Sequence, residues 1–97
     1  MNIIITIPAY NEEKCLPTVL DEIAAVMRQT EYKYQILVLD DGSRDKTAEV
    51  ARQKGVIVLS HPRNLGLAET FRREMRECLR LKADIIVHTD ADGQYHP

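Results

Sequence analysis

The chain has 97 residues, of which 44% are hydrophobic and 29% are charged, as is typical of one soluble globular domain. Thirteen basic residues against fifteen acidic ones give a net charge of −2, which excludes a nucleic-acid site built on bulk positive charge. The sequence shows neither the ~20-residue apolar run of a membrane span nor the pattern of a signal peptide. Its two cysteines are far apart and suit a reducing compartment. We therefore expect a cytoplasmic protein, or one at the cytosolic face of a membrane.

Four short apolar runs, rich in β-branched residues, predict strands at residues 2–7, 35–39, 56–59 and 85–87. Pro8 is expected to end the first of them. Apolar spacings of three and four residues predict helices between the strands, at about residues 16–29, 46–54 and 67–81. Pro17 suits the first turn of the first helix.

The third helix is expected to bury an apolar stripe and to expose a charged face to solvent. The stripe consists of Leu67, Ala68, Phe71, Met75, Cys78 and Leu79, and the charged face of Arg72, Arg73, Glu74, Arg76, Glu77 and Arg80. Both cysteines are expected to be inert thiols.

Strand–helix alternation of this kind predicts one α/β domain over residues 1–97, with a parallel, Rossmann-like sheet of about four strands and three helices. Polar motifs follow the first, second and fourth strands. Open parallel sheets bind ligands beyond the carboxyl ends of their strands, where the strand order reverses. With the order 3-2-1-4, the motifs after strands one and four would line one crevice, and the motif after strand two would lie beside it.

The last of these motifs places Asp90 and Asp92 two residues apart, directly after a strand. Residues i and i+2 of an extended backbone project to the same side, so the two carboxylates can face one point. Two ionised carboxylates repel each other unless a cation or a proton lies between them. A hard divalent cation, Mg²⁺ or Mn²⁺, is therefore the favoured ligand, and a simple turn with Gly93 is the alternative.

Three motifs, at residues 8–12, 39–45 and 90–97, together resemble the nucleotide-binding half of a family-2 glycosyltransferase with the GT-A fold. The third motif is similar to that of the polyprenyl-phosphate sugar transferases of the dolichyl-phosphate mannose synthase type. Each motif alone has low specificity, but three at three strand ends in the right order are specific. Among the departures from the family pattern, Gly93 and Tyr95 change the third motif, and Glu74 stands where glycine is frequent.

The resemblance implies a nucleotide-sugar donor linked to GDP or UDP, and a role for each motif. The implied donor-binding residues are Pro8, Ala9, Tyr10, Glu12, Leu39, Asp41, Asp90, Ala91 and Asp92, and the implied metal ligands are Asp90, Asp92 and Gln94. The first loop would contact base and ribose, and Asp41 would accept an N–H group from uracil or guanine. Mg²⁺ or Mn²⁺ would act as a Lewis acid on the diphosphate leaving group.

The resemblance further implies inverting transfer to a lipid phosphate or a saccharide, with an acceptor-binding half and a catalytic base beyond Pro97. We therefore expect the 97-residue segment alone to bind the donor without catalysing transfer. An unpaired edge of the fourth strand would also favour homo-oligomers.

Two other protein classes are compatible with parts of the sequence. One is a non-catalytic α/β module that binds nucleotide or self-associates. The other is a phosphohydrolase of the haloacid dehalogenase type, whose nucleophile strand also ends in Asp-x-Asp-Gly; the position of the motif on the fourth strand and Gln94 after the glycine argue against it.

Several polar residues have simpler structural interpretations. Asp40 and Ser43 suit a turn. For Glu12 the structural alternative is to stabilise the N-terminal end of the first helix. His61 is expected to be a loop residue, and His88 to be packed within its strand.

Overall fold

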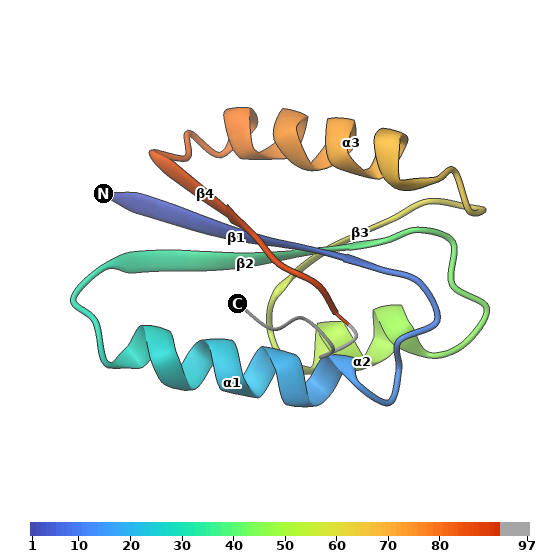
Figure 1. The fold of residues 1–97 in the computed structure, drawn as a ribbon, viewed down its shortest axis with the longest axis horizontal. Helices are drawn as coiled ribbons and strands as arrows, with labels where there is room; N and C mark the ends of the chain where they lie inside the picture. The colour runs from blue at the N-terminus through green and yellow to red at the C-terminus, as the bar shows by residue number, and fades with distance from the viewer. Residues whose placement is uncertain (92–97) are drawn as a thin grey trace.

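Four parallel strands form one sheet in the order β3-β2-β1-β4, as the sequence predicts (Figure 1). The computed structural model describes residues 1–91. The strands are β1 (Asn2–Ala9), β2 (Lys33–Asp40), β3 (Ile57–Ser60) and β4 (Ile85–His88), and the helices are α1 (Leu16–Arg28), α2 (Thr47–Gln53) and α3 (Leu67–Arg80). Figure 1 shows α1 and α2 on one face of the sheet and α3 on the other, so the sheet is the middle of three layers.

Alternate residues of β1 enter two separate hydrophobic clusters. Ile3, Ile5 and Ile7 pack with buried residues of α1 and α2, whereas Ile4 packs with Cys78 of α3. Because successive side chains of a strand point to opposite faces, β1 is buried on both sides. This double burial explains its continuous apolar run.

β1 continues through Pro8, so the expectation that Pro8 ends this strand is wrong. Successive residues of a parallel strand present their backbone groups alternately to the two neighbouring strands. The carbonyl of Thr6, two residues earlier, accepts a hydrogen bond from the Thr89 N–H at 3.0 Å, on the β4 side. The nitrogen of Pro8 therefore also faces the β4 side. The β1–β4 pairing has already ended there, at His88, so the missing N–H of proline costs no ladder hydrogen bond.

α3 buries a different face from the one predicted. Leu67 and Leu79 are each 78% exposed, whereas Glu74, expected at the surface, is completely buried. The buried residues of α3 are Thr70, Glu74 and Cys78, which follow one another at intervals of four. Only Cys78 of the predicted apolar stripe is among them.

Contacts at both ends of α3 determine which face meets the sheet. Before the helix, the N–H groups of Leu65 and Gly66 donate hydrogen bonds to the Asp41 carboxylate at the end of β2. After the helix, the side-chain amide of Asn2 donates to the Leu81 carbonyl at 3.2 Å. These polar contacts between segments distant in sequence fix the rotation of the helix, and the apolar pattern of α3 does not contain them.

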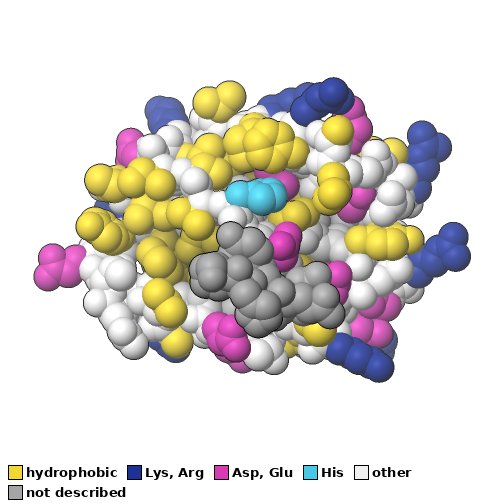
Figure 2. Space-filling model, viewed as in Figure 1, with side chains coloured by type: hydrophobic (Ala, Val, Ile, Leu, Met, Phe, Trp, Pro, Cys, Tyr) yellow, Lys and Arg dark blue, Asp and Glu magenta, His cyan; other side chains and the backbone are white. Residues whose placement is uncertain are grey.

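β4 lies at one edge of the sheet and is exposed along its length. Its apolar residues Ile85, Ile86 and Val87 all remain partly accessible to solvent. Figure 2 shows hydrophobic side chains gathered on the side of the molecule where β4 lies. Because β4 is an edge strand, its one hydrogen-bonded neighbour within residues 1–91 is β1.

Candidate nucleotide-binding site

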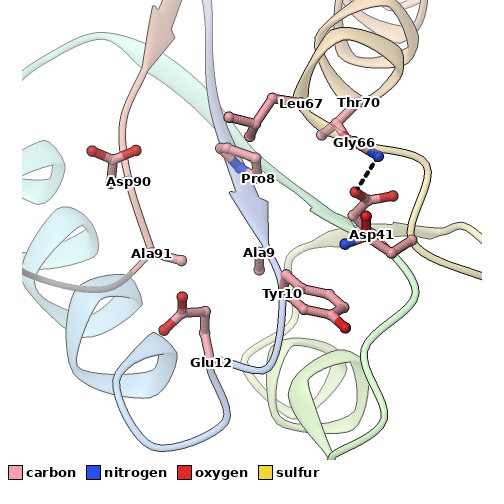
Figure 3. Close-up of a pocket in the computed structure, with 11 residues that line it drawn as sticks. Pro8, Ala9, Tyr10, Glu12, Asp41, Gly66, Leu67, Thr70, Asp90 and Ala91 are labelled. Atoms are coloured by element: carbon pink, nitrogen blue, oxygen red, sulfur yellow. Dashed lines mark hydrogen bonds between the residues drawn. The ribbon is translucent and has the colours of Figure 1, made fainter.

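A pocket of about 310 Å³ opens beyond the carboxyl ends of β1, β2 and β4, next to the start of α3 (Figure 3). Its position agrees with the crevice predicted from the strand order, because the order reverses between β1 and β4. The residues that line it are Pro8, Ala9, Tyr10, Glu12, Asp41, Asn64, Gly66, Leu67, Thr70, Asp90 and Ala91.

Most residues predicted to bind the donor lie in this pocket. The predicted residues found there are Pro8, Ala9, Tyr10, Glu12, Asp41, Asp90 and Ala91. Leu39 does not line the pocket, since it lies fully buried within β2. Asp92 and Gln94, predicted to hold the metal, lie outside the described residues.

Hydrogen bonds join the loop after β1 to the loop after β2. The Asn11 N–H donates to the Ser43 hydroxyl at 2.8 Å, and the Asn11 side-chain oxygen accepts from the Arg44 N–H at 2.9 Å. One residue further, the Glu12 N–H donates to the Thr47 hydroxyl at 2.9 Å. The two loops therefore position Glu12 as a unit, held by the first residue of α2.

Three hydrogen bonds hold the Asp41 carboxylate in the pocket. Its Oδ1 accepts hydrogen bonds from His61 Nδ1 at 2.7 Å and from the Leu65 N–H at 2.9 Å, and its Oδ2 accepts from the Gly66 N–H at 2.9 Å. Burial alone would raise the pKa of Asp41, but the His61 and backbone hydrogen bonds outweigh burial and lower the pKa below its usual value. Asp41 is therefore an ionised carboxylate, and His61 Nδ1 is the donor to it.

His61 lies in the loop after β3, as predicted, but its side chain is buried against Asp41. The backbone N–H of His61 donates to the Asp40 carbonyl at 2.9 Å. Nothing in the local sequence indicates this contact, because twenty residues separate His61 from Asp41. The Asp40 side chain accepts from the Ser43 N–H at 3.0 Å, in agreement with the turn role predicted for both residues.

Gly42 allows the loop after β2 to touch the loop before α3. Its φ is +74°, and a Cβ atom there would lie 2.2 Å from the Arg63 carbonyl carbon and 2.4 Å from the Asn64 nitrogen. Only glycine fits such a close backbone approach. This approach brings the loop of residues 63–66 within reach of the Asp41 carboxylate.

The opposite wall of the pocket is acidic. Figure 3 shows Glu12 and Asp90 on the β4 side, with Ala91 between them. Asp90 is exposed, whereas Ala91 is buried. Across residues 1–91, no group of three His, Cys, Asp or Glu side chains is placed to hold a metal ion.

Four residues of the pocket were not predicted from sequence: Asn64, Gly66, Leu67 and Thr70. All follow β3, the strand after which no acidic motif occurs. The available signal was the glycine at residue 66, directly before a helix, where backbone N–H groups are free to bind an anion. In this structure the anion at that position is the Asp41 carboxylate.

A second polar cluster lies between α3 and the sheet. The Thr6 hydroxyl and His88 Nδ1 are hydrogen-bonded at 2.8 Å, and His88 Nδ1 lies 3.7 Å from Glu74 Oε2. His88 also lies against the Phe71 ring, 5.8 Å away between ring centroids, but its side chain is 41% exposed, so His88 is not the packed residue that the sequence predicts. Among the described residues, neither carboxyl oxygen of Glu74 has a hydrogen-bond partner, and burial raises the pKa of Glu74 to about 7.

A helix-covered parallel sheet with a polar pocket beyond its carboxyl ends defines the class of α/β nucleotide-binding folds. The family model for glycosyl transferase family 2 matches residues 4–97. The chain belongs to this family.

Relatives by sequence include transferases that are named for dolichyl phosphate and undecaprenyl phosphate. Uncharacterized protein MJ1222 of Methanocaldococcus jannaschii is 42% identical over 98% of this chain and 37% of its own length. Dolichyl-phosphate beta-glucosyltransferase ALG5D of Trichomonas vaginalis is 35% identical over 90% of this chain and 29% of its own length. The chain therefore spans about a third of the length of these relatives.

Solved structures with the same fold are glycosyltransferases. Mannosyl-3-phosphoglycerate synthase from Rubrobacter xylanophilus has a TM-score of 0.85 and 25% identity over all of this chain and 33% of its own. Glucosyl-3-phosphoglycerate synthase from Mycobacterium tuberculosis, in complex with Mn²⁺, UDP and glucosyl-3-phosphoglycerate, has a TM-score of 0.75 and 28% identity over 93% of this chain and 33% of its own. The predicted GT-A nucleotide-binding half is thereby confirmed as the fold of this chain.

Proposed function

We propose that this chain binds the nucleotide-sugar donor of a metal-dependent glycosyltransferase, and that residues 1–97 form the nucleotide-binding part of its GT-A domain. The observation that carries the proposal is the pocket itself, in which a fixed, ionised Asp41 faces an acidic wall formed by Glu12 and Asp90. A nucleoside diphosphate needs an acceptor for base N–H groups at one end and a cation site for its diphosphate at the other. The M. tuberculosis relative holds UDP and Mn²⁺ together.

We assign the base to the Asp41 side of the pocket and the diphosphate to the Asp90 side. Asp41 is anionic and accepts hydrogen bonds only, so it suits an N–H group of a base and would repel phosphate. Pro8 and Tyr10 offer the base an apolar and an aromatic surface beside it. Glu12 lies on the same wall as Asp90, and we assign its carboxylate to a ribose hydroxyl.

The residues at the Asp90 end suit Mg²⁺ or Mn²⁺. Asp90 is an exposed carboxylate on the pocket wall. Asp92 and Gln94 follow it in the sequence and carry side-chain oxygen atoms of the type that hard cations prefer. When bound there, the cation would offset the negative charge that develops on the leaving nucleoside diphosphate. The chain's own contribution is to hold the donor's base and ribose so that the anomeric carbon has a defined position.

The proposed reaction is inverting glycosyl transfer. An acceptor oxygen forms a bond to the anomeric carbon, the bond from that carbon to the diphosphate oxygen breaks, and the diphosphate carries away the bonding electrons. A polyprenyl or other lipid phosphate is the proposed acceptor, because the T. vaginalis relative is named for dolichyl phosphate.

No helix within residues 1–91 is long and apolar enough to cross a membrane.

Calorimetric titration with UDP, GDP and GDP-mannose, with Mn²⁺ and with EDTA, tests the proposal. Nucleotide should bind to the wild-type chain in the presence of Mn²⁺, and Asp92→Ala should lose this binding. Asp21→Asn is the matched control, because Asp21 lies in α1 and forms only a surface ion pair with Lys54. A wild-type chain that binds none of these nucleotides contradicts the proposal.

We also propose that the open edge of β4 supports self-association. Its backbone groups on the side away from β1 have no strand partner within residues 1–91, and Ile85, Ile86 and Val87 are partly exposed beside them. Such an edge pairs readily with another strand. Light scattering should detect a dimer or larger assembly, and a strictly monomeric species would rule this out.

A further inference from the structure

We propose that this pocket selects uracil over guanine, because the Asp41 carboxylate has only one hydrogen-bond acceptor position left. The inference rests on the donor-binding function proposed above and identifies the base of that donor. It follows from the number of donors already bound to each oxygen of Asp41.

A carboxylate offers about four acceptor positions, two on each oxygen. Oδ1 of Asp41 is saturated, since it accepts from both His61 Nδ1 and the Leu65 N–H. Among residues 1–91, Oδ2 accepts only from the Gly66 N–H and retains one position. A base that enters this pocket can therefore place one N–H group on Asp41, and on Oδ2 only.

Uracil and guanine differ in what they require of such a carboxylate. Uracil has a single N–H on its recognition edge, at N3, with a carbonyl on each side. Guanine has the N1–H and, next to it, the 2-amino group, so full recognition needs one free position on each carboxylate oxygen. Guanine would leave its amino group opposite the saturated Oδ1, and an unpaired buried donor is costly.

The saturation of Oδ1 cannot be relieved by a small movement. His61 is buried, and its backbone N–H is itself bonded to the Asp40 carbonyl. The loop that carries Leu65 is held against Gly42 at backbone contact distance. Freeing a second position on Asp41 therefore means moving either a buried ring or a packed loop.

Thr70 offers the complementary group for a pyrimidine carbonyl. It lines the pocket next to Gly66, is 1% exposed, and its hydroxyl has no hydrogen-bond partner among the described residues (Figure 3). Threonine in a helix occupies two rotamers, so the hydroxyl can turn toward an incoming acceptor. An N–H on Asp41 Oδ2 with a neighbouring carbonyl near Thr70 matches the N3–H and a carbonyl of uracil. It equally matches the N1–H and O6 of guanine, so Thr70 orients the base and the acceptor count of Asp41 discriminates between the two bases.

A nucleotide series on the wild-type chain tests the inference by calorimetry in the presence of Mn²⁺. UDP should bind at least about tenfold more tightly than GDP, the cost of one unpaired donor. IDP, which is GDP without the 2-amino group, should bind more tightly than GDP, and CDP, whose N3 carries no hydrogen, should bind weakly. GDP binding as tightly as UDP, or IDP no better than GDP, would overturn the inference.

Variants of His61 test the acceptor count directly. His61→Phe removes one donor from Oδ1 and should raise the affinity for GDP relative to UDP, whereas His61→Asn retains an N–H close to the position of Nδ1 and should preserve the UDP preference. Thr70→Val should weaken UDP binding several-fold, and Thr70→Ser should not. If the ratio of GDP affinity to UDP affinity is the same in His61→Phe and His61→Asn, the acceptor positions of Asp41 do not determine the base preference.

The two proposals fail in different ways. A chain that binds no nucleoside diphosphate refutes the donor-binding function. A chain that binds GDP and UDP equally, with dependence on Mn²⁺, refutes only the base preference.

Discussion

At Gly42, one absent side chain allows two loops of the site to touch. Gly42→Ala should destabilise the chain and also weaken nucleotide binding, because the new Cβ would lie 2.2 Å from the backbone of Arg63 and displace the loop that binds Asp41. Chemical denaturation together with UDP titration measures both effects.

Gly55→Ala provides the matched control for this prediction. Gly55 has nearly the same conformation, with a φ of +76°, but within the described part of the chain no atom beyond its two chain neighbours lies within 4 Å of the position of its Cβ. It should therefore show only the cost of a left-handed residue, about 1–2 kcal/mol, with unchanged UDP affinity. If Gly42→Ala and Gly55→Ala change stability and UDP affinity equally, the close approach of the two loops at Gly42 contributes to neither.

Glu74 should make the stability of the chain depend on pH. Its pKa is about 7 in the folded state and near 4.5 when unfolded, since burial favours the neutral acid. The stabilisation from protonated Glu74 is complete below about pH 4.5 and is lost as the pH rises through about 7. Relative to Glu74→Gln, wild type should lose up to about 3 kcal/mol across this range.

Denaturation curves at several pH values measure this difference. The slope with pH is the relevant quantity, because the buried glutamine amide adds a constant cost of its own. Glu69→Gln serves as the control, since Glu69 is exposed and pairs with Arg72 on the surface of α3. His88, Thr6 and Cys78 remain unchanged around Glu74, so an identical slope in Glu74→Gln would show that Glu74 is not the titrating group.

At the scale of elements, strands and helices could be predicted to within two residues at each end. Their signals are local: β-branched runs, apolar spacing, and a proline or glycine at an end. Pro8 misled the prediction because the effect of a proline in a strand depends on which neighbour its nitrogen faces. That neighbour, β4, comes almost eighty residues later in the chain.

The buried face of α3 could not be predicted, for a related reason. An amphipathic pattern predicts a buried stripe only when apolar burial alone decides the rotation of the helix. In α3 the rotation follows polar contacts with Asp41 and Asn2, and the helix buries Glu74 while Leu67 and Leu79 stay exposed. A glutamate inside the protein has no signature in the sequence pattern.

For the whole molecule, the fold predicted the place of the site. A parallel sheet brings the carboxyl ends of its strands to one edge, so motifs far apart in the sequence meet in one pocket. Glu12, Asp41 and Asp90 could be found in this way. His61 and Thr70 could not, because each takes part through a tertiary contact and belongs to no motif.

The central claim is that this pocket binds a nucleoside diphosphate together with a divalent cation. The affinity of the wild-type chain for UDP, measured by calorimetry with Mn²⁺ and again with EDTA, tests it most directly. The account predicts saturable binding that is at least about tenfold tighter with Mn²⁺, the scale on which groups around a metal affect binding. Absence of UDP binding under both conditions would contradict it.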